Sequence, residues 1–185
     1  MQSDKSERDS VQLAGEHLLG YIQNTMSRVD WPAFLNLADM IPDSKRVFVT
    51  GAGRSGLVAR MFAMRLMHAG LTSFVPGETT TPAAGPGDLL VAISCTGTTG
   101  YTEYLTRRAS ELGARTAVLT SEITGSLSSD VDLIVEIPTP PGDIVLRAAV
   151  FEHATSLCLD AVFNVLSQRM NIDELDFRSR HANLE

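Results

Sequence analysis

The sequence predicts an α/β fold, namely a three-layer α-β-α sandwich with a five-stranded parallel sheet, N-terminal helices and a C-terminal helical tail. Short apolar runs alternate along the chain with segments of helical periodicity, a pattern typical of parallel strands joined by helical crossovers. The run Leu89–Ile93 is apolar without interruption, as expected of a strand buried on both faces. At 185 residues, 44% of them hydrophobic, the chain has the size and composition of one compact domain.

The N-terminal part of the chain predicts a flexible start followed by two helices. Residues 1–9 are polar and charged, so we expect them to be frayed and a single domain to cover residues 10–185. Apolar residues recur at helical spacing over Val11–Met26 and predict the first helix. Asp30, followed by tryptophan and proline, predicts an N-cap with proline in the first turn, and hence a second helix over Trp31–Met40.

From residue 46 onward the pattern alternates between strands and helices. Five runs predict strands, the second of them weak: Arg46–Thr50, Ser73–Val75, Asp88–Ile93, Arg115–Leu119 and Asp132–Ile137. Three helices are predicted by spacing, with a short turn or helix before the last strand: Leu57–Met67, Thr98–Leu112 and Val145–Met170, and the turn at Ser126–Asp130. Strands that alternate with helices in this way form a parallel sheet with right-handed crossovers.

Composition excludes several classes of protein. The formal net charge of −7 argues against binding along a nucleic-acid backbone, which requires a basic face. Cys95 and Cys158 have neither CxxC spacing nor histidines at metal-ligand spacing, so we predict reduced apolar side chains, no disulfide and no metal site. No apolar run reaches membrane-spanning length and the first residues are polar, so we expect no membrane segment, no secretion signal and a cytoplasmic protein.

Two loops rich in glycine and hydroxyl groups are the strongest functional signal: Thr50–Gly56 (TGAGRSG) and Ser94–Gly100 (SCTGTTG). Each follows a predicted strand and opens a predicted helix, so both should lie at the same edge of the sheet. A helix N-terminus carries unpaired N–H groups and a partial positive charge, glycine lets the backbone approach a ligand, and Ser or Thr adds donors. We therefore predict a site for the phosphate group of a small metabolite.

Two other interpretations of these loops remain open. Gly51, Gly53 and Gly56 match the spacing of the dinucleotide fingerprint GxGxxG. However, the acidic residue expected at the end of the second strand is replaced by Thr72–Pro76, with Glu78 beyond it. A dinucleotide fold also does not predict the second loop. The other interpretation is that the hydroxyls of the second loop only cap the helix that follows it. The absence of a G-K-[ST] ending excludes a P-loop nucleoside triphosphatase.

Three segments match a known family: GAGRSG at 51–56 running into FAMRLMH at 62–68, GETTTP at 77–82 before Gly87-Asp88, and RHANLE at 180–185. Together with the second loop they resemble the sugar isomerase (SIS) domain family, and within it the 6-phospho-3-hexuloisomerase branch, over about residues 10–185. The loops are moderately specific, whereas MRLMH and HANLE are much more so. The resemblance implies an SIS-type fold and the binding of a phosphosugar.

The resemblance also implies roles for individual residues. The sugar phosphate would be bound by the two loops: Gly53, Arg54, Ser55, Ser94, Thr96, Thr98 and Thr99. Glu152 matches the proposed catalytic base of the family, and His181 matches a C-terminal histidine that assists in the site of a neighbouring subunit. Three features depart from the family pattern: Cys95 replaces a glycine, His153 stands where glutamine is common, and the segment Pro140–Ala149 is shorter than usual.

Most of these side chains are of types that also occur in purely structural roles. Glu152 could be an ordinary glutamate near the start of a helix, and His181 a surface histidine near the end of the chain. His68 is expected to be structural, because its helix should pack on the sheet. Arg54 could pair with substrate or with a neighbouring acid, whereas Arg65 is expected to form a salt bridge.

The reaction implied by the resemblance moves a carbonyl between C3 and C2 of a ketose phosphate, so that D-arabino-3-hexulose 6-phosphate becomes fructose 6-phosphate. Glu152 would transfer the proton through a cis-enediol, and His181 would relay protons between the oxygens. The family implies no cofactor or metal, a homotetramer built as a dimer of dimers, and a place in ribulose monophosphate metabolism. The alternatives are an arabinose 5-phosphate isomerase, a non-catalytic phosphosugar-binding module and a dinucleotide-binding domain.

Overall fold

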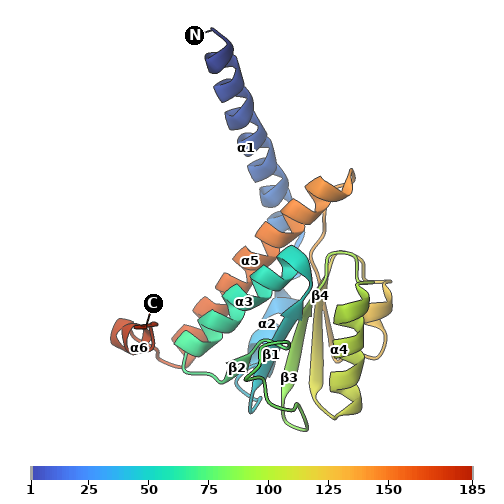
Figure 1. Ribbon diagram of the computed structural model, residues 1–185, viewed down its shortest axis with the longest axis vertical. Helices are drawn as coiled ribbons and strands as arrows, with labels where there is room; N and C mark the ends of the chain where they lie inside the picture. The colour runs from blue at the N-terminus through green and yellow to red at the C-terminus, as the bar shows by residue number, and fades with distance from the viewer. Residues whose placement is uncertain (1, 185) are drawn as a thin grey trace.

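The computed structural model describes the backbone of residues 2–184 and the side chains of residues 9–184. Five parallel strands form one sheet in the order β2-β1-β3-β4-β5: β1 Val47–Gly51, β2 Ser73–Phe74, β3 Leu89–Ile93, β4 Arg115–Thr120 and β5 Leu133–Glu136. The helices of the described chain are α1 Gln2–Arg28, α2 Trp31–Met40, α3 Gly53–His68, α4 Gly100–Glu111, the 3-10 helix η1 Ser126–Ser128, α5 Ile144–Arg169 and α6 Glu174–Ser179. The predicted fold class is confirmed (Figure 1).

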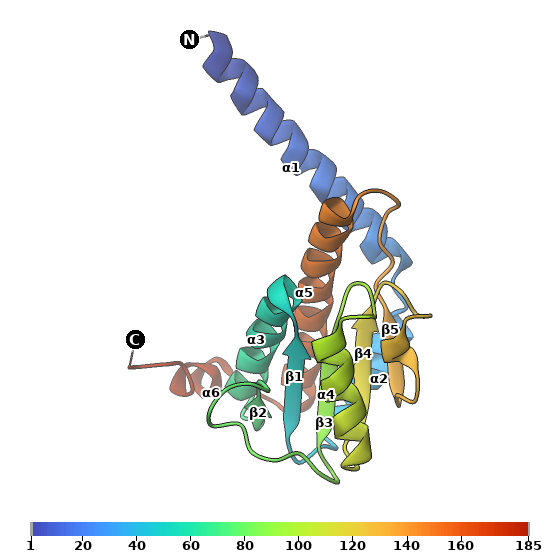
Figure 2. The same ribbon diagram turned by 45° about the vertical axis from the view of Figure 1, so that its right-hand side comes forward.

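Helices cover both faces of the sheet (Figures 1 and 2). On one face lie α2, α3 and α5, with the end of α1 packed against α5, and on the other lie α4 and η1. Most of α1 projects away from the sheet, and its described side chains before Ile22 are exposed or half-buried. The predicted flexible segment, residues 1–9, falls almost wholly outside the described side chains and stays a prediction.

Most elements begin and end within a few residues of their predicted bounds. There are two exceptions: α1 begins at Gln2 rather than Val11, and α3 begins at Gly53 rather than Leu57 because the second half of the glycine loop already forms its first turn. Asp30 precedes α2 as predicted, but its side chain makes no capping hydrogen bond. The start of α2 is therefore set by proline in the first turn, whose fixed φ suits a helix, and by apolar packing.

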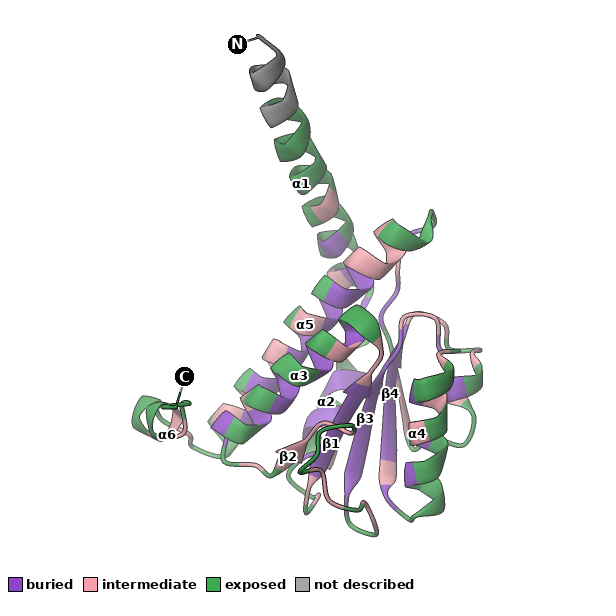
Figure 3. Cartoon of the chain, in the orientation of Figure 1, coloured by how far each residue is buried: buried purple, intermediate pink, exposed green. Residues whose placement is uncertain are grey.

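Alternate residues of the central strands belong to different hydrophobic clusters. Figure 3 shows that these strands are largely buried. The larger core contains Val49 and Val91 of β1 and β3 together with the fully buried Phe151 of α5. A smaller core contains Phe48 and Leu90 of the same strands, packed toward α4, and another contains Ala92, Val118 and Leu127. Both faces of the sheet are covered, and β3 is buried along its whole length, as predicted for Leu89–Ile93.

The apolar stripe that predicts α3 does not face the sheet. Leu57, Met61, Met64 and Met67 are 60%, 54%, 52% and 38% exposed. The helix packs on the core through its other side: Val58, Ala59, Phe62, Ala63 and Leu66. The apolar flank whose spacing predicts α5 is likewise only partly buried, since Val150 is buried but Leu157 is exposed. This flank consists of Leu146, Val150, Leu157, Ala161 and Val165. Helical spacing locates these helices, but which side meets the sheet depends on the packing of the whole domain.

Among the described residues, α5 is the one helix that is long and apolar enough to cross a membrane by length and composition alone. This modifies the expectation that no apolar segment reaches such a length. However, 56% of its apolar window is buried inside the protein, and Phe151, Cys158 and Leu166 are fully covered. We therefore describe α5 as a core helix of the domain, and Cys158 as one of its apolar side chains.

Candidate active site

The two glycine- and hydroxyl-rich loops begin side by side. β1 and β3 are neighbouring parallel strands, with Thr50 opposite Ala92 and Gly51 opposite Ile93. Since both strands end at the same edge of the sheet, the loop into α3 and the loop into α4 emerge next to each other. This edge therefore carries two helix N-termini, as the parallel topology predicts.

Close backbone packing accounts for the glycines of the first loop. A Cβ atom at Gly51 would lie 2.9 Å from the carbonyl oxygens of Ile93 and Ser55. A Cβ atom at Gly56 would lie 2.7 Å from the carbonyl oxygen of Gly51. Gly53 has a φ of +57°, a conformation that L residues rarely adopt. The GxGxxG spacing thus follows from this tight turn and lends no separate support to a dinucleotide site.

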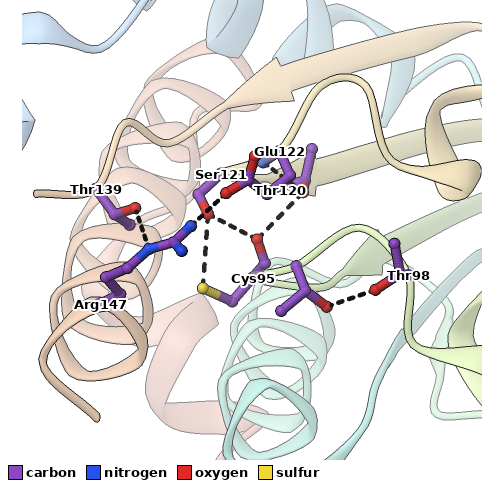
Figure 4. Close-up of polar contacts among 8 residues, drawn as sticks. Cys95, Thr98, Thr120, Ser121, Glu122, Thr139 and Arg147 are labelled. Atoms are coloured by element: carbon purple, nitrogen blue, oxygen red, sulfur yellow. Dashed lines mark hydrogen bonds and ion pairs between the residues drawn. The ribbon is translucent and has the colours of Figure 1, made fainter. Parts of the chain in front are cut away.

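The hydroxyl groups of the second loop pair with one another rather than with the helix that follows. Thr99 is the N-cap residue of α4, yet its side chain makes no capping hydrogen bond. Instead its Oγ1 lies 3.1 Å from Oγ of Ser94, and Oγ1 of Thr98 donates to Oγ1 of Thr96 at 3.2 Å (Figure 4). A purely capping role is therefore wrong for the N-cap residue, and four hydroxyls gather near a helix N-terminus that favours an anion.

The first turn of α3 brings further predicted site residues to this edge. Its N-cap is Ala52, whose side chain has no acceptor, so the first N–H groups of α3 are also uncapped. Ser55 is only 9% exposed in this turn. Arg54 forms an ion pair with Glu152 of α5, 98 residues away in the sequence. The Glu152 side chain is 8% exposed, so the predicted base is a buried side chain paired with an arginine beside the first loop.

The end of β4 adds residues that the sequence analysis did not single out. Ser121 Oγ donates to the carbonyl oxygen of Cys95 at 2.7 Å. Glu122 forms an ion pair with Arg147, near the start of α5, and Arg147 Nε donates to Thr139 Oγ1 at 3.5 Å (Figure 4). One signal for Ser121 is that β4, like β3, is followed directly by a serine. No local signal links residues 122 and 147.

Cys95 lies among these groups, and the charges around it affect the pKa of its thiol. The residue is free and half-buried, with Sγ 3.6 Å from Ser121 Oγ. Burial is the largest influence on the pKa of this thiol and raises it. The hydrogen bond with Ser121 and the charge of Arg147 lower the pKa, and the charges of Glu152 and Glu122 raise it. The net shift is upward, so the thiol stays protonated at neutral pH in a site that holds both signs of charge.

His181 lies far from Glu152 within one chain. Its ring stacks on His68, with ring centroids 4.8 Å apart, and Phe177 of α6 packs against both rings. His68 is the last residue of α3, whereas Arg54 lies in the first turn, so the two ends are roughly 20 Å apart at the rise of an α-helix. The structure therefore does not bring the two predicted catalytic residues together in a single subunit.

The other singled-out side chains have surroundings typical of structural residues. His68 is 3% exposed, and its pKa is lowered first by burial and then by the nearby charges of His181 and Arg65. Arg65 Nε donates to a carboxylate oxygen of Asp160 at 3.2 Å, the salt bridge expected from the sequence. His153 follows Glu152 but is exposed. Among the side chains that the structure describes, no group of three His, Cys, Asp or Glu residues could hold a metal ion.

Comparison with known proteins identifies the family. Residues 40–164 match the family model of the SIS domain. The chain belongs to the SIS domain family. Among SIS relatives, the 3-hexulose-6-phosphate isomerase of Mycobacterium gastri is 41% identical over 89% of this chain and 86% of that protein. The 3-hexulose-6-phosphate isomerase of Bacillus subtilis is 34% identical over 91% of this chain and 95% of that protein.

A solved SIS structure agrees with these relatives. The crystal structure of a Methanococcus jannaschii protein, for which a function of 3-hexulose-6-phosphate isomerase was inferred, has a TM-score of 0.83 and 30% sequence identity. The match covers 90% of this chain and 98% of that one. Because several relatives are named as isomerases and align over nearly their whole length, this SIS protein is an isomerase.

Proposed function

We propose that this SIS protein is a phosphosugar isomerase that interconverts D-arabino-3-hexulose 6-phosphate and fructose 6-phosphate. The observation that carries the proposal is the buried Glu152, paired with Arg54 beside two loops rich in hydroxyl groups. Two relatives named 3-hexulose-6-phosphate isomerase, at 41% and 34% identity over most of the chain, support this choice of substrate.

The phosphate group would bind between the N-termini of α3 and α4. Backbone N–H groups of the first turn from Gly53 onward, with the hydroxyl of Ser55, would donate from one side. The hydroxyls of the second loop would donate from the other, exchanging their mutual contacts for the anion: Ser94, Thr96, Thr98 and Thr99. Binding energy from the phosphate would then orient the reacting carbons, which are otherwise free to rotate.

Glu152 would be the base. A carboxylate can accept a proton, and this one lies beside the guanidinium of Arg54. Glu152 would remove the proton from C2 of the 3-ketose, giving a cis-enediol across C2 and C3, and would return a proton to C3 as the carbonyl forms at C2. Arg54, 65% exposed, would face the substrate oxygens on which negative charge develops.

His181 would relay the hydroxyl protons from a neighbouring subunit. It is exposed, and it lies at the opposite end of α3 from Glu152. The exposed stripe formed by Leu57, Met61 and Met64 on α3 is surface of the kind that oligomers cover. We therefore propose a homotetramer, built as a dimer of dimers, in which the tail of one subunit completes the site of another. We place this enzyme in the cytoplasm and expect it to need no cofactor.

An activity panel tests the proposal. The purified protein is assayed with 3-hexulose 6-phosphate and arabinose 5-phosphate, and its thermal stability is measured with fructose 6-phosphate and NAD. We expect turnover of the hexulose phosphate and stabilisation by fructose 6-phosphate. Turnover of arabinose 5-phosphate alone would contradict the substrate. Stabilisation by sugar phosphates without any turnover would instead indicate a binding module.

A further inference from the structure

Two arginine–glutamate pairs lie at the carboxyl edge of the sheet, and they differ in which partner is covered. In the first pair the Arg54 side chain is 65% exposed and the Glu152 side chain 8%. In the second pair the Arg147 side chain is 27% exposed and the Glu122 side chain 45%. The second pair thus combines a largely covered cation with an acid that water reaches.

This difference in exposure determines which arginine can leave its glutamate partner and bind a phosphate dianion. Taking Arg54 away from Glu152 would leave a buried carboxylate without its partner, and uncompensated buried charge is costly. Taking Arg147 away from Glu122 releases a carboxylate that is already half in water, and exposed ion pairs contribute little stability. Arg147 is therefore the cation that an incoming anion can take from its present partner.

Arg147 is also held beside the second loop. Glu122, its partner, directly follows Ser121, whose hydroxyl donates to the carbonyl oxygen of Cys95 at 2.7 Å. Arg147, Ser121 and Cys95 therefore form one connected cluster, anchored on its far side by Thr139 (Figure 4). The lowering effect of Arg147 on the pKa of the Cys95 thiol is a second sign that the guanidinium lies near this loop.

We propose that Arg147 binds the phosphate group of the substrate, and that Glu122 holds the guanidinium in place until the phosphate displaces it. The planar guanidinium presents paired donors that match two phosphate oxygens. It also supplies a full positive charge beside the second loop, which carries none of its own. This proposal rests on the proposed function for the identity of the sugar, but it concerns only recognition of the phosphate.

Opposite changes at the two partners test the proposal. Binding of fructose 6-phosphate and of inorganic phosphate to the full chain is measured by calorimetry at low salt. We expect Arg147→Gln to weaken both ligands about ten- to a hundredfold, the effect of losing a hydrogen bond between charged groups, with Arg147→Lys intermediate. We expect Glu122→Gln to strengthen both, because it removes the competing carboxylate. A gain in affinity cannot result from a variant that fails to fold.

The surface pair Arg108–Glu111 on α4, with a distance of 2.9 Å, provides matched controls. Arg108→Gln and Glu111→Gln change the net charge equally and should leave both affinities unchanged. Wild-type affinity in Arg147→Gln, a loss for fructose 6-phosphate but not for inorganic phosphate, or a loss in Glu122→Gln would each overturn the proposal. If the wild type does not turn over hexulose phosphate but the opposite shifts remain, the substrate assignment fails and the role of Arg147 stands.

Discussion

Glu152 is the residue on which the proposed chemistry depends. Its side chain is buried, and it is paired with an arginine from the loop that would bind the phosphate. A base in this position acts on a substrate whose phosphate is already bound by the loops. Glu152 would therefore transfer the proton, and other groups would supply the binding energy. Replacing the carboxylate should therefore reduce turnover and leave affinity nearly unchanged.

The substitution Glu152→Gln keeps the size of the side chain and removes the base. We expect kcat to fall by about 10²–10⁴-fold, the range for a general base, with little change in affinity for fructose 6-phosphate. Steady-state kinetics with calorimetry measure the two effects separately, and Glu111→Gln on α4 is the control. A loss in kcat below about tenfold, with binding intact, would remove Glu152 from this role.

The hydroxyl groups of the two loops should act together on the phosphate. We expect the double substitution Ser55→Ala with Thr99→Ala to weaken binding of fructose 6-phosphate roughly 10- to 100-fold, because two donors to a charged acceptor are lost. Binding of unphosphorylated fructose should change far less. Ser110→Ala, on the exposed surface of α4, is the control. Equal weakening of both sugars would contradict the assignment of these hydroxyls to the phosphate.

At the scale of elements, the two loops depend on the register of β1 and β3. Arg46 and Asp88 each precede one of these strands, and Asp88 accepts two hydrogen bonds from the guanidinium at 2.9 and 2.6 Å. Burial raises the pKa of the Asp88 carboxyl, but the bonds from Arg46 and from the Gly85 N–H outweigh it. The pKa therefore lies below its ordinary value of 3.8.

This pair predicts a pH-dependent stability. A carboxyl group whose pKa is lowered by folding stabilises the protein fully above its unfolded pKa, and that contribution is lost as the pH falls through the folded value. At pH 7 we expect Asp88→Asn to lower Tm by roughly 5 °C, and the difference from wild type should shrink below pH 3.8.

Thermal melts from pH 7 to pH 3 measure this effect. Asp39→Asn, which breaks an exposed pair with Arg169, is the matched control and should have little effect at any pH. If the difference in Tm between wild type and Asp88→Asn stays constant below pH 3.8, ionisation of Asp88 does not contribute to stability.

At the scale of the whole molecule, one subunit does not hold both predicted catalytic residues. Glu152 of α5 pairs with Arg54 in the first turn of α3, whereas His181 stacks on His68, the last residue of α3. If His181 acts across an interface, each complete site takes Glu152 from one chain and His181 from another. Mixing two inactive chains, one without Glu152 and one without His181, therefore tests whether the site is shared.

Co-expression of Glu152→Gln and His181→Asn chains with different affinity tags should restore activity. In mixed oligomers that assemble at random, about a quarter of the sites combine a wild-type Glu152 with a wild-type His181, because the two come from different chains. Activity near that fraction of wild type, in oligomers that carry both tags, is the expected result. Mixed oligomers no more active than either parent would show that His181 does not complete a neighbouring site.

The order of helices and strands, the parallel sheet and the meeting of the two loops follow from short-range patterns. Hydrophobic periodicity and turn residues are properties of a few neighbouring positions, and parallel strands place the loops that follow them at one edge. The predicted strand Asp88–Ile93 and helix Trp31–Met40 agree with the structure to within a residue for this reason. The family resemblance added Glu152 and His181, which no local pattern would have selected.

The ion pairs of the candidate site depend on tertiary packing. Arg54 meets Glu152 across 98 residues, and Arg147 meets Glu122 because α5 returns to the end of β4. Likewise, the stripe on α3 is apolar in sequence but faces outward, since the sheet is met by the other side of the helix. By itself, the sequence determined which elements form and where hydroxyl-bearing loops follow strands. Only the folded chain decided which charges meet, because contacts between distant segments depend on how all the layers pack together.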